Sequence, residues 1–187
     1  MNVTIRRFER ADIPRKAAWI NNPENNRYLH YDLPLEIGKT ERWFDKNLGR
    51  TDRYDAVIEE EGIPVGLVGL LRIDGKNHKA EYYISMGETA YKGKGIAKQA
   101  SRLILKYGFE ELGLNKIYLF TEAENIGAQK LFERIGFVRE GILRQDICFA
   151  KQYVDRIMYG ILRTDYLKRK NEWENEHTDT SAGSLQS

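Results

Sequence analysis

The chain has 187 residues, 41% of them hydrophobic and 31% charged, a mixture that excludes a wholly disordered polymer and is typical of a folded domain. Its 30 Lys and Arg residues against 28 Asp and Glu leave a net charge of +2, which argues against a dedicated nucleic-acid-binding protein. The single cysteine, Cys148, allows no disulfide within the chain, so we expect a cytoplasmic protein.

The sequence predicts no membrane-spanning or targeting segment. Its most apolar stretch, residues 63–71, is much shorter than the about 20 residues that a spanning helix needs. Residues 1–10 contain three arginines with no apolar run behind them, so they do not form a signal peptide. We therefore expect neither a membrane nor a nucleic acid among the partners.

In chain order, the first half of the sequence predicts a short strand, two helices and three consecutive strands. Asp12 is a suitable N-cap for the first helix, and Pro14 is tolerated in its first turn. Turn residues such as Gly62 and Gly75 separate the strands, which indicates an antiparallel meander. These six elements are expected over residues 3–5, 12–19, 40–48, 55–59, 64–73 and 80–86.

The second half predicts helices that alternate with strands, and then a hairpin. Residues 95–113 form the clearest helix, because apolar residues recur there at helical spacing. The remaining elements are expected over residues 117–121, 125–135, 141–149 and 153–162. The strand–helix–strand order of residues 80–121 adds a parallel crossover to a sheet that begins antiparallel, so we expect an α+β fold.

Residues 171–187 differ in composition from the rest of the chain. They contain four acidic residues and no Lys or Arg. We expect residues 1–170 to form a single domain and residues 171–187 to be an acidic, disordered C-terminal tail. An acidic interaction segment is the alternative interpretation of the same composition.

A glycine-rich segment before the longest predicted helix is the strongest local signal. It consists of Lys92, Gly93, Lys94, Gly95, Ile96 and Ala97. Glycines let the backbone approach a ligand closely, and the unpaired amides at a helix N-terminus attract anions. The segment lacks the spacing of a P-loop and of a dinucleotide-binding fingerprint, so neither nucleotide fold is supported. It predicts a phosphate-bearing ligand of another kind, the alternative being a solvated basic helix face.

This segment resembles the cofactor-binding signature of the GNAT superfamily of N-acetyltransferases. Lys92, Gly95 and Ala97 stand at its Arg/Gln, Gly and Gly/Ala positions, although Lys92 departs from the usual Arg or Gln. The resemblance implies a GNAT-like fold, with a twisted, mostly antiparallel sheet of six or seven strands, a parallel splayed pair in its middle and about four flanking helices. It covers about residues 3–167.

A second segment carries the resemblance further along the chain. Asn125 opens a helix that ends in Gly136 and Phe137, as in the family. The residues after Trp19, together with the helix that holds Trp43, resemble the branch of ribosomal-protein-alanine, spermidine and aminosugar acetyltransferases.

The resemblance implies acetyl-CoA as co-substrate and no metal. The glycine-rich segment would hold the pyrophosphate, the strand before it would pair with the pantetheine arm, and Asn125 and Lys130 would contact the cofactor from the next helix. The implied cofactor-binding residues are Ile84, Ser85, Met86, Lys92, Gly93, Lys94, Gly95, Ile96, Ala97, Asn125 and Lys130.

Acetyl transfer to an amine needs a proton acceptor, because an amine with a pKa near ~10 is protonated at neutral pH. Glu81 is the first candidate, since it shares a strand face with Tyr83; the alternative is that Glu81 only pairs with a cation of a neighbouring strand. The backbone amide of Met86 is the expected oxyanion donor by analogy with the family. Phe132 stands where many members have a tyrosine acid, so we assign no general acid; Tyr83, Tyr91, Tyr118 or water are the alternatives.

The acceptor pocket is expected between residues 26–33, the Trp43 helix and the final hairpin. The expected substrate-binding residues are His30, Tyr31, Asp32, Trp43 and Tyr83. His30 and Asp32 are also secondary candidates for the base.

The leading hypothesis is an acetyl-CoA-dependent N-acetyltransferase in which a primary amine attacks directly in a ternary complex. Its acceptor would be a small amine, an aminosugar or a protein N-terminus. The alternative is a non-catalytic acyl-CoA-binding or regulatory module of the same fold. A homodimer is compatible with either hypothesis.

Overall fold

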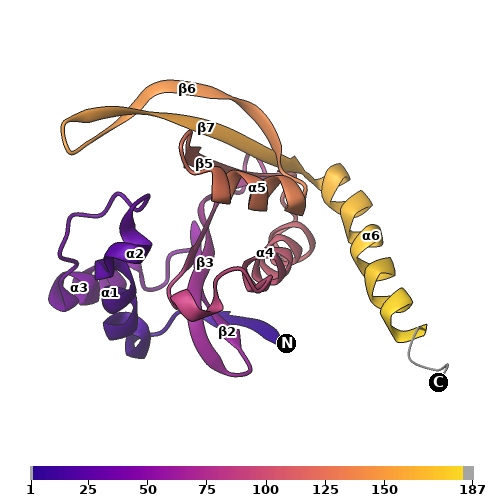
Figure 1. Cartoon of the computed structure of the whole chain (residues 1–187), viewed down its shortest axis with the longest axis horizontal. Helices are drawn as coiled ribbons and strands as arrows, with labels where there is room; N and C mark the ends of the chain where they lie inside the picture. The colour runs from indigo at the N-terminus through magenta and orange to yellow at the C-terminus, as the bar shows by residue number, and fades with distance from the viewer. Residues whose placement is uncertain (1, 183–187) are drawn as a thin grey trace.

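The computed structural model describes residues 2–182, with side chains as far as residue 174. Seven strands form one sheet in the order β1-β2-β3-β4-β5-β7-β6 (Figure 1). Their bounds are β1 (Val3–Arg7), β2 (Arg53–Glu60), β3 (Ile63–Asp74), β4 (Lys79–Met86), β5 (Lys116–Glu122), β6 (Val138–Phe149) and β7 (Gln152–Leu162). This sheet confirms the predicted strands and the α+β fold class.

Six α-helices accompany the sheet in the described part of the chain. They are α1 (Ile13–Asn21), α2 (Pro23–Asn26), α3 (Ile37–Asn47), α4 (Ile96–Lys106), α5 (Ile126–Ile135) and α6 (Arg163–Ala182). The short α2 and the C-terminal α6 have no counterpart among the predicted helices, and the other four do.

Strands β4 and β5 form the parallel pair, and they separate after a short stretch. Their pairing joins Lys79 to Lys116 and ends where Glu81 lies beside Tyr118. Beyond that point β4 pairs only with β3, and β5 pairs only with β7. All other neighbouring strands are antiparallel, so the sheet opens in its middle as the resemblance implied.

Helices cover both faces of the sheet. Helices α4 and α5 lie on one face, and α1 and α3 lie on the other (Figure 1). Because strand side chains alternate between faces, Tyr82 packs into the core under α4 and α5, whereas Tyr83 packs with Trp43 on the opposite face. The two cores therefore meet along β4.

The predicted helix over residues 95–113 is shorter in the structure. Helix α4 ends at Lys106, and Tyr107–Glu111 form a wider π-helical turn in which Leu112 N donates to Tyr107 O at 3.0 Å. Gly108 lies in this turn, and a Cβ there would lie only 2.7 Å from Ile117 Cδ1. Glycine thus allows the turn to pack directly against β5.

The structure also differs from the predicted C-terminal tail. Helix α6 passes through the predicted boundary at residue 170, and Trp173 is only 8% exposed. Trp173 packs edge-on to Tyr166, and the guanidinium of Arg102 in α4 lies 4.5 Å from its ring centroid. The acidic composition of this segment predicted disorder, although one of its aromatic side chains is buried. Residues 183–187 of the predicted tail lie outside the described residues.

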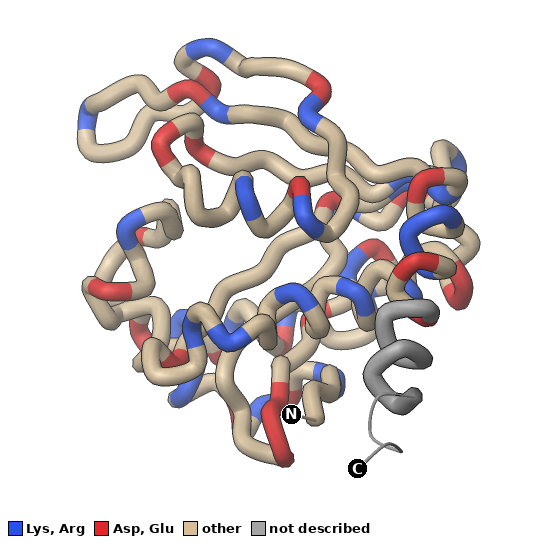
Figure 2. The backbone as a smooth tube through the Cα atoms, turned by 45° about the vertical axis from the view of Figure 1, so that its right-hand side comes forward, with Lys and Arg blue, Asp and Glu red and all other residues tan. Residues whose placement is uncertain are grey.

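Both blue Lys and Arg positions and red Asp and Glu positions occur around the described backbone, separated by uncharged stretches (Figure 2). Between residues 2 and 182, no helix combines the length and the apolar character required to cross a bilayer.

Candidate functional site

A cleft of about 680 Å³ opens where β4 and β5 part. Past Glu81 and Tyr118, neither inner strand edge has a strand partner across the gap, so backbone amides and carbonyls face the cleft. An extended ligand that carries amide groups can pair with such an edge as an added strand would. We call this space the splay cleft.

A groove of about 310 Å³ continues from the splay cleft to the N-terminus of α4. Gly95 is the N-cap of α4 with φ at +83°, and Gly93 has φ at +76°. Positions that a Cβ would take at Gly93 and Gly127 have no atom within 4 Å, so both glycines leave open space at the groove. The open amides of α4 make this end suitable for phosphate groups, so these residues fit a phosphate-bearing cofactor.

Most residues predicted to bind the cofactor line one of these two spaces. Those in the splay cleft are Ile84, Met86, Lys92, Gly93, Ala97 and Asn125, and those that the groove adds are Gly95 and Ile96. Ser85 lines a different cavity, and Lys94 and Lys130 line neither space.

Two groove cations were not among the predicted cofactor-binding residues. Lys98 lies in the first turn of α4, and Arg134 lies one turn beyond Lys130 in α5. Lys130 was predicted to contact the cofactor, and residues four apart share a helix face. The spacing could therefore have predicted Arg134 as a second cation of this face.

Lys92 and Asn125 have structural partners of their own. Lys92 Nζ donates to Asn25 Oδ1 at 2.7 Å and to Glu24 O at 3.2 Å, which ties the glycine-rich segment to α2. Asn125 caps α5, because its Oδ1 accepts from Ala128 N at 3.2 Å. Only the amide NH₂ of Asn125 can then donate to a ligand in the cleft.

Two carboxylates line the splay cleft, and their surroundings differ. Glu81 forms an ion pair with Arg72, a residue of β3 whose side chain is largely exposed. Glu122, at the end of β5, lies with its Oε1 2.9 Å from His30 Nε2. That contact lacks hydrogen-bond geometry, and no described residue donates a hydrogen bond to this buried oxygen. Glu122 therefore presents an incompletely satisfied carboxylate to the cleft, a feature that the sequence did not indicate.

Phe132 and Tyr83, two aromatic residues that line the cleft, do not supply a proton. Phe132 is buried in a cluster with Tyr82 and Phe137, so it has a packing role. The Tyr83 hydroxyl donates to Asp55 Oδ1 at 2.7 Å, and burial together with this carboxylate raises the pKa of Tyr83 well above its usual value. Tyr83 therefore holds its proton firmly.

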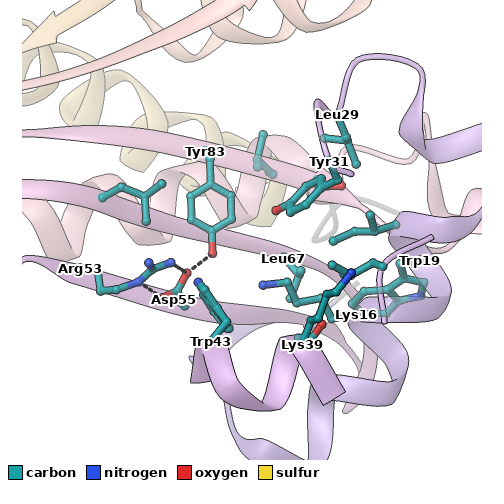
Figure 3. A pocket seen from close by; sticks show the side chains of 16 residues that line it. Lys16, Trp19, Leu29, Tyr31, Lys39, Trp43, Arg53, Asp55, Leu67 and Tyr83 are labelled. Atoms are coloured by element: carbon teal, nitrogen blue, oxygen red, sulfur yellow. Dashed lines mark hydrogen bonds and ion pairs between the residues drawn. The ribbon is translucent and has the colours of Figure 1, made fainter. Parts of the chain in front are cut away.

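A second cavity, of about 400 Å³, lies between the sheet and helices α1 and α3 (Figure 3). We call it the Lys16 cavity. Tyr31, Trp43 and Tyr83 line it, as predicted for the acceptor pocket. His30 lines the splay cleft instead, whereas Asp32 is exposed and lines neither space.

An ion pair and a buried lysine set the charge of the Lys16 cavity. Arg53 donates to Asp55 through Nε at 2.6 Å and through Nη2 at 2.8 Å, beside the Tyr83 hydroxyl (Figure 3). Lys16 is 8% exposed, and its Nζ lies 3.6 Å from the ring centroid of Trp43. Burial lowers the pKa of Lys16 to about 8, and the nearby Asp55 opposes part of this shift.

Metal-binding side chains do not gather anywhere in the described structure. Among its described residues, no three His, Cys, Asp or Glu side chains come close enough together to hold an ion.

Comparisons with known proteins agree with this geometry. A family model described as "Acetyltransferase (GNAT) domain" matches residues 2–138. Spermidine N(1)-acetyltransferase of Escherichia coli K12 is 32% identical over 169 residues, which cover 89% of each chain. The putative ribosomal N-acetyltransferase YdaF of Bacillus subtilis is 34% identical over 185 residues, which cover 94% of this chain and 95% of that one. A crystal structure of Vibrio cholerae spermidine N-acetyltransferase with CoA and spermine superposes with a TM-score of 0.82 at 31% identity, covering 88% of this chain and 98% of the other.

Proposed function

Because this chain belongs to the GNAT acetyltransferase family and is an acetyl-CoA-dependent N-acetyltransferase of amines, we propose that transfer takes place in the splay cleft. The parting of β4 and β5 is the main support, since it opens unpaired backbone edges beside the glycine-rich start of α4. Acetyl-CoA supplies the activated thioester, and the protein supplies position, charge and a proton acceptor.

We assign the cofactor-binding role to two sets of groups. The inner edge of β4, from Ile84 to Met86, would pair with the pantetheine arm, and the amides of the segment from Gly93 to Ala97 would receive the pyrophosphate. Lys98 and Arg134 add positive charge along the groove. Lys92 contributes through its backbone and through its tie to Asn25.

We place the proton-accepting role at Glu122, with His30 as the group that positions it. An entering ammonium would meet a buried carboxylate oxygen that receives no hydrogen bond from the described residues. Glu81 is the other candidate, but its ion pair with Arg72 already partly neutralises its charge. The Met86 amide, at the end of β4, would donate to the oxyanion that develops on the thioester carbonyl. We assign no general acid.

The acceptor is a small-molecule amine, and its identity can be tested directly. Spermidine is the acceptor in the names of several relatives, and the name of YdaF, a putative ribosomal N-acetyltransferase, indicates a ribosomal acceptor. The experiment is thiol release from acetyl-CoA with polyamines, amino acids, aminosugars and N-terminal peptides. Release with one amine class identifies the acceptor, whereas CoA binding without release for any amine would favour a non-catalytic module.

We further propose a homodimer formed through the outer edge of the sheet. Strand β6 pairs with β7 alone, and Val138 and Ile142 on it are exposed. An open edge strand with apolar side chains is suited to pairing with a second copy. Light scattering gives the molar mass of the wild type and of Ile142→Lys in solution. A dimeric wild type with a monomeric Ile142→Lys variant supports the proposed interface, and a monomeric wild type overturns it.

A further inference from the structure

We propose that the Lys16 cavity binds an anionic group of the acceptor, so that the preferred acceptor is an amine with a carboxylate or phosphate at its other end. This inference rests on the proposed function, because the amine end is placed in the splay cleft. It adds a charge requirement that amine acetylation by itself does not contain.

The first observation is that the Lys16 ammonium lies against aromatic rings rather than against a carboxylate. Lys16 lies on α1 with 8% of its surface exposed, and its Nζ rests on the face of Trp43 at 3.6 Å from the ring centroid. No described carboxylate lies within ion-pair distance of this nitrogen. Buried charges in proteins are normally paired, so an unpaired one that lines a cavity points to a partner that arrives with a ligand.

The other charges of the cavity compensate Lys16 only in part. Asp55 is the carboxylate in its lining, and it already accepts two hydrogen bonds from Arg53 and one from Tyr83. Lys39, at the rim, pairs with Glu36 at 2.6 Å. The lining is therefore positive overall, which opposes a second ammonium group and favours an anion.

The remaining lining suits the chain that joins the two ends of such an acceptor. Trp43, Tyr31 and Leu67 provide aromatic and aliphatic walls (Figure 3). Hydroxyl groups of Tyr31 and Ser85 are further donors for an anion. A volume of about 400 Å³ is in the range of small-molecule sites.

The two spaces adjoin along β4. Leu29, Tyr83 and Ile84 line both the splay cleft and the Lys16 cavity. One acceptor can therefore place its amine near Glu122 and its anionic end near Lys16. The opposite charges of these two groups would fix its direction of entry.

The test compares acceptors of equal length that differ only at the far end. Thiol release is measured with ε-aminocaproate, hexamethylenediamine and hexylamine, and with γ-aminobutyrate, putrescine and butylamine. We expect kcat/KM for the amino acid to exceed that of the matched diamine and alkylamine by roughly 10- to 100-fold. In Lys16→Met this preference should disappear, while Lys46→Met, an exposed lysine on α3, should retain it.

A binding measurement separates this inference from the proposed function. Caproate has no amine, so calorimetric binding of caproate to the CoA-loaded protein reports on the Lys16 cavity without any turnover. Caproate binding that is lost in Lys16→Met supports the anionic subsite even if no amine tested is acetylated. Diamines preferred over amino acids by the wild type, or caproate binding that is absent or unchanged in Lys16→Met, would overturn it.

Discussion

At Lys16 the chain buries an ammonium group that no described carboxylate neutralises. Desolvation lowers its pKa from 10.5 to about 8, so the group is charged at neutral pH at a cost to folding. Glu122 is a comparable case, since one of its oxygens is buried without a hydrogen bond from any described residue. Both groups line the spaces in which we place the acceptor, as expected where binding, rather than folding, satisfies a polar group.

Removing the buried charge should stabilise the protein. Lys16→Met keeps the length of the side chain, and we expect it to raise the free energy of unfolding at pH 7 by up to about 3 kcal/mol. The folded pKa of Lys16 is about 8 and its ordinary value is 10.5, so the unfolded chain binds more protons between these values. Stability of the wild type relative to Lys16→Met should therefore rise with pH across that window. Urea denaturation at several pH values measures it, and equal stability at pH 7 would contradict the expected cost.

The same substitution at the two cleft carboxylates should lower the rate by different amounts. Glu122→Gln removes the acceptor of the amine proton, so we expect kcat at neutral pH to fall by about 10²–10⁴-fold. Part of the rate should return at high pH, where more of the amine is neutral. Glu81→Gln should cost less, because Arg72 already partly neutralises that carboxylate. Steady-state kinetics with an identified acceptor decide between them, and the reverse order would assign the base to Glu81.

At the scale of elements, α5 is the wall that closes the cofactor groove opposite α4. Asn125 begins this helix, and Gly127 in its first turn leaves the groove open. On the other side of the sheet, Asn25 donates to Gly87 O at 2.7 Å and accepts from Lys92. These two hydrogen bonds join α2 to the end of β4 and to the glycine-rich segment. At Gly87 a Cβ would lie 2.1 Å from the Trp19 ring, so only glycine permits this close packing. The site is thus assembled from element ends.

A side chain at Gly127 should occupy the groove without harming the helix. Gly127→Leu improves helix propensity by roughly 0.5–1 kcal/mol, so the melting temperature should not fall. The added side chain would fill space next to the groove, and we expect CoA affinity to fall by about 100-fold or more, against a smaller change for Gly127→Ala. Calorimetry with CoA measures both variants. Undiminished affinity in Gly127→Leu would place the cofactor elsewhere.

Helix α6 should contribute to stability beyond residue 170. Trp173→Ala removes a buried ring that packs on Tyr166 and Arg102, and we expect a loss of about 3 kcal/mol. Asn171→Ala, on the exposed part of the same helix, is the matched control and should be neutral. Thermal unfolding compares the two variants, with CoA affinity nearly unchanged in both. A Trp173→Ala protein as stable as the wild type would contradict this contribution and would favour the predicted disordered tail after residue 170.

At the scale of the whole molecule, one sheet separates two packed faces. The face under α4 and α5 contains the larger core, while the face under α1 and α3 contains the Lys16 cavity. The gap between β4 and β5 lies where these faces meet, so cofactor and acceptor can approach one reaction point from different sides. The basic residues of α4 do not face the groove together, because Arg102 packs under Trp173 and, of the basic residues in this helix, only Lys98 lines the groove.

Sequence alone determined the order of the strands and of helices α1, α3, α4 and α5, and the position of the glycine-rich segment before α4. Apolar spacing, Asn125 as a helix start and the glycines around Gly95 are local signals, and each depends on neighbours only a few residues away. Tertiary structure decided which distant side chains meet, namely His30 with Glu122, Lys16 with Trp43 and Arg102 with Trp173. These contacts depend on how the strands part and on how the helices pack across the sheet. No local periodicity encodes such distances, because folding of the whole chain sets them.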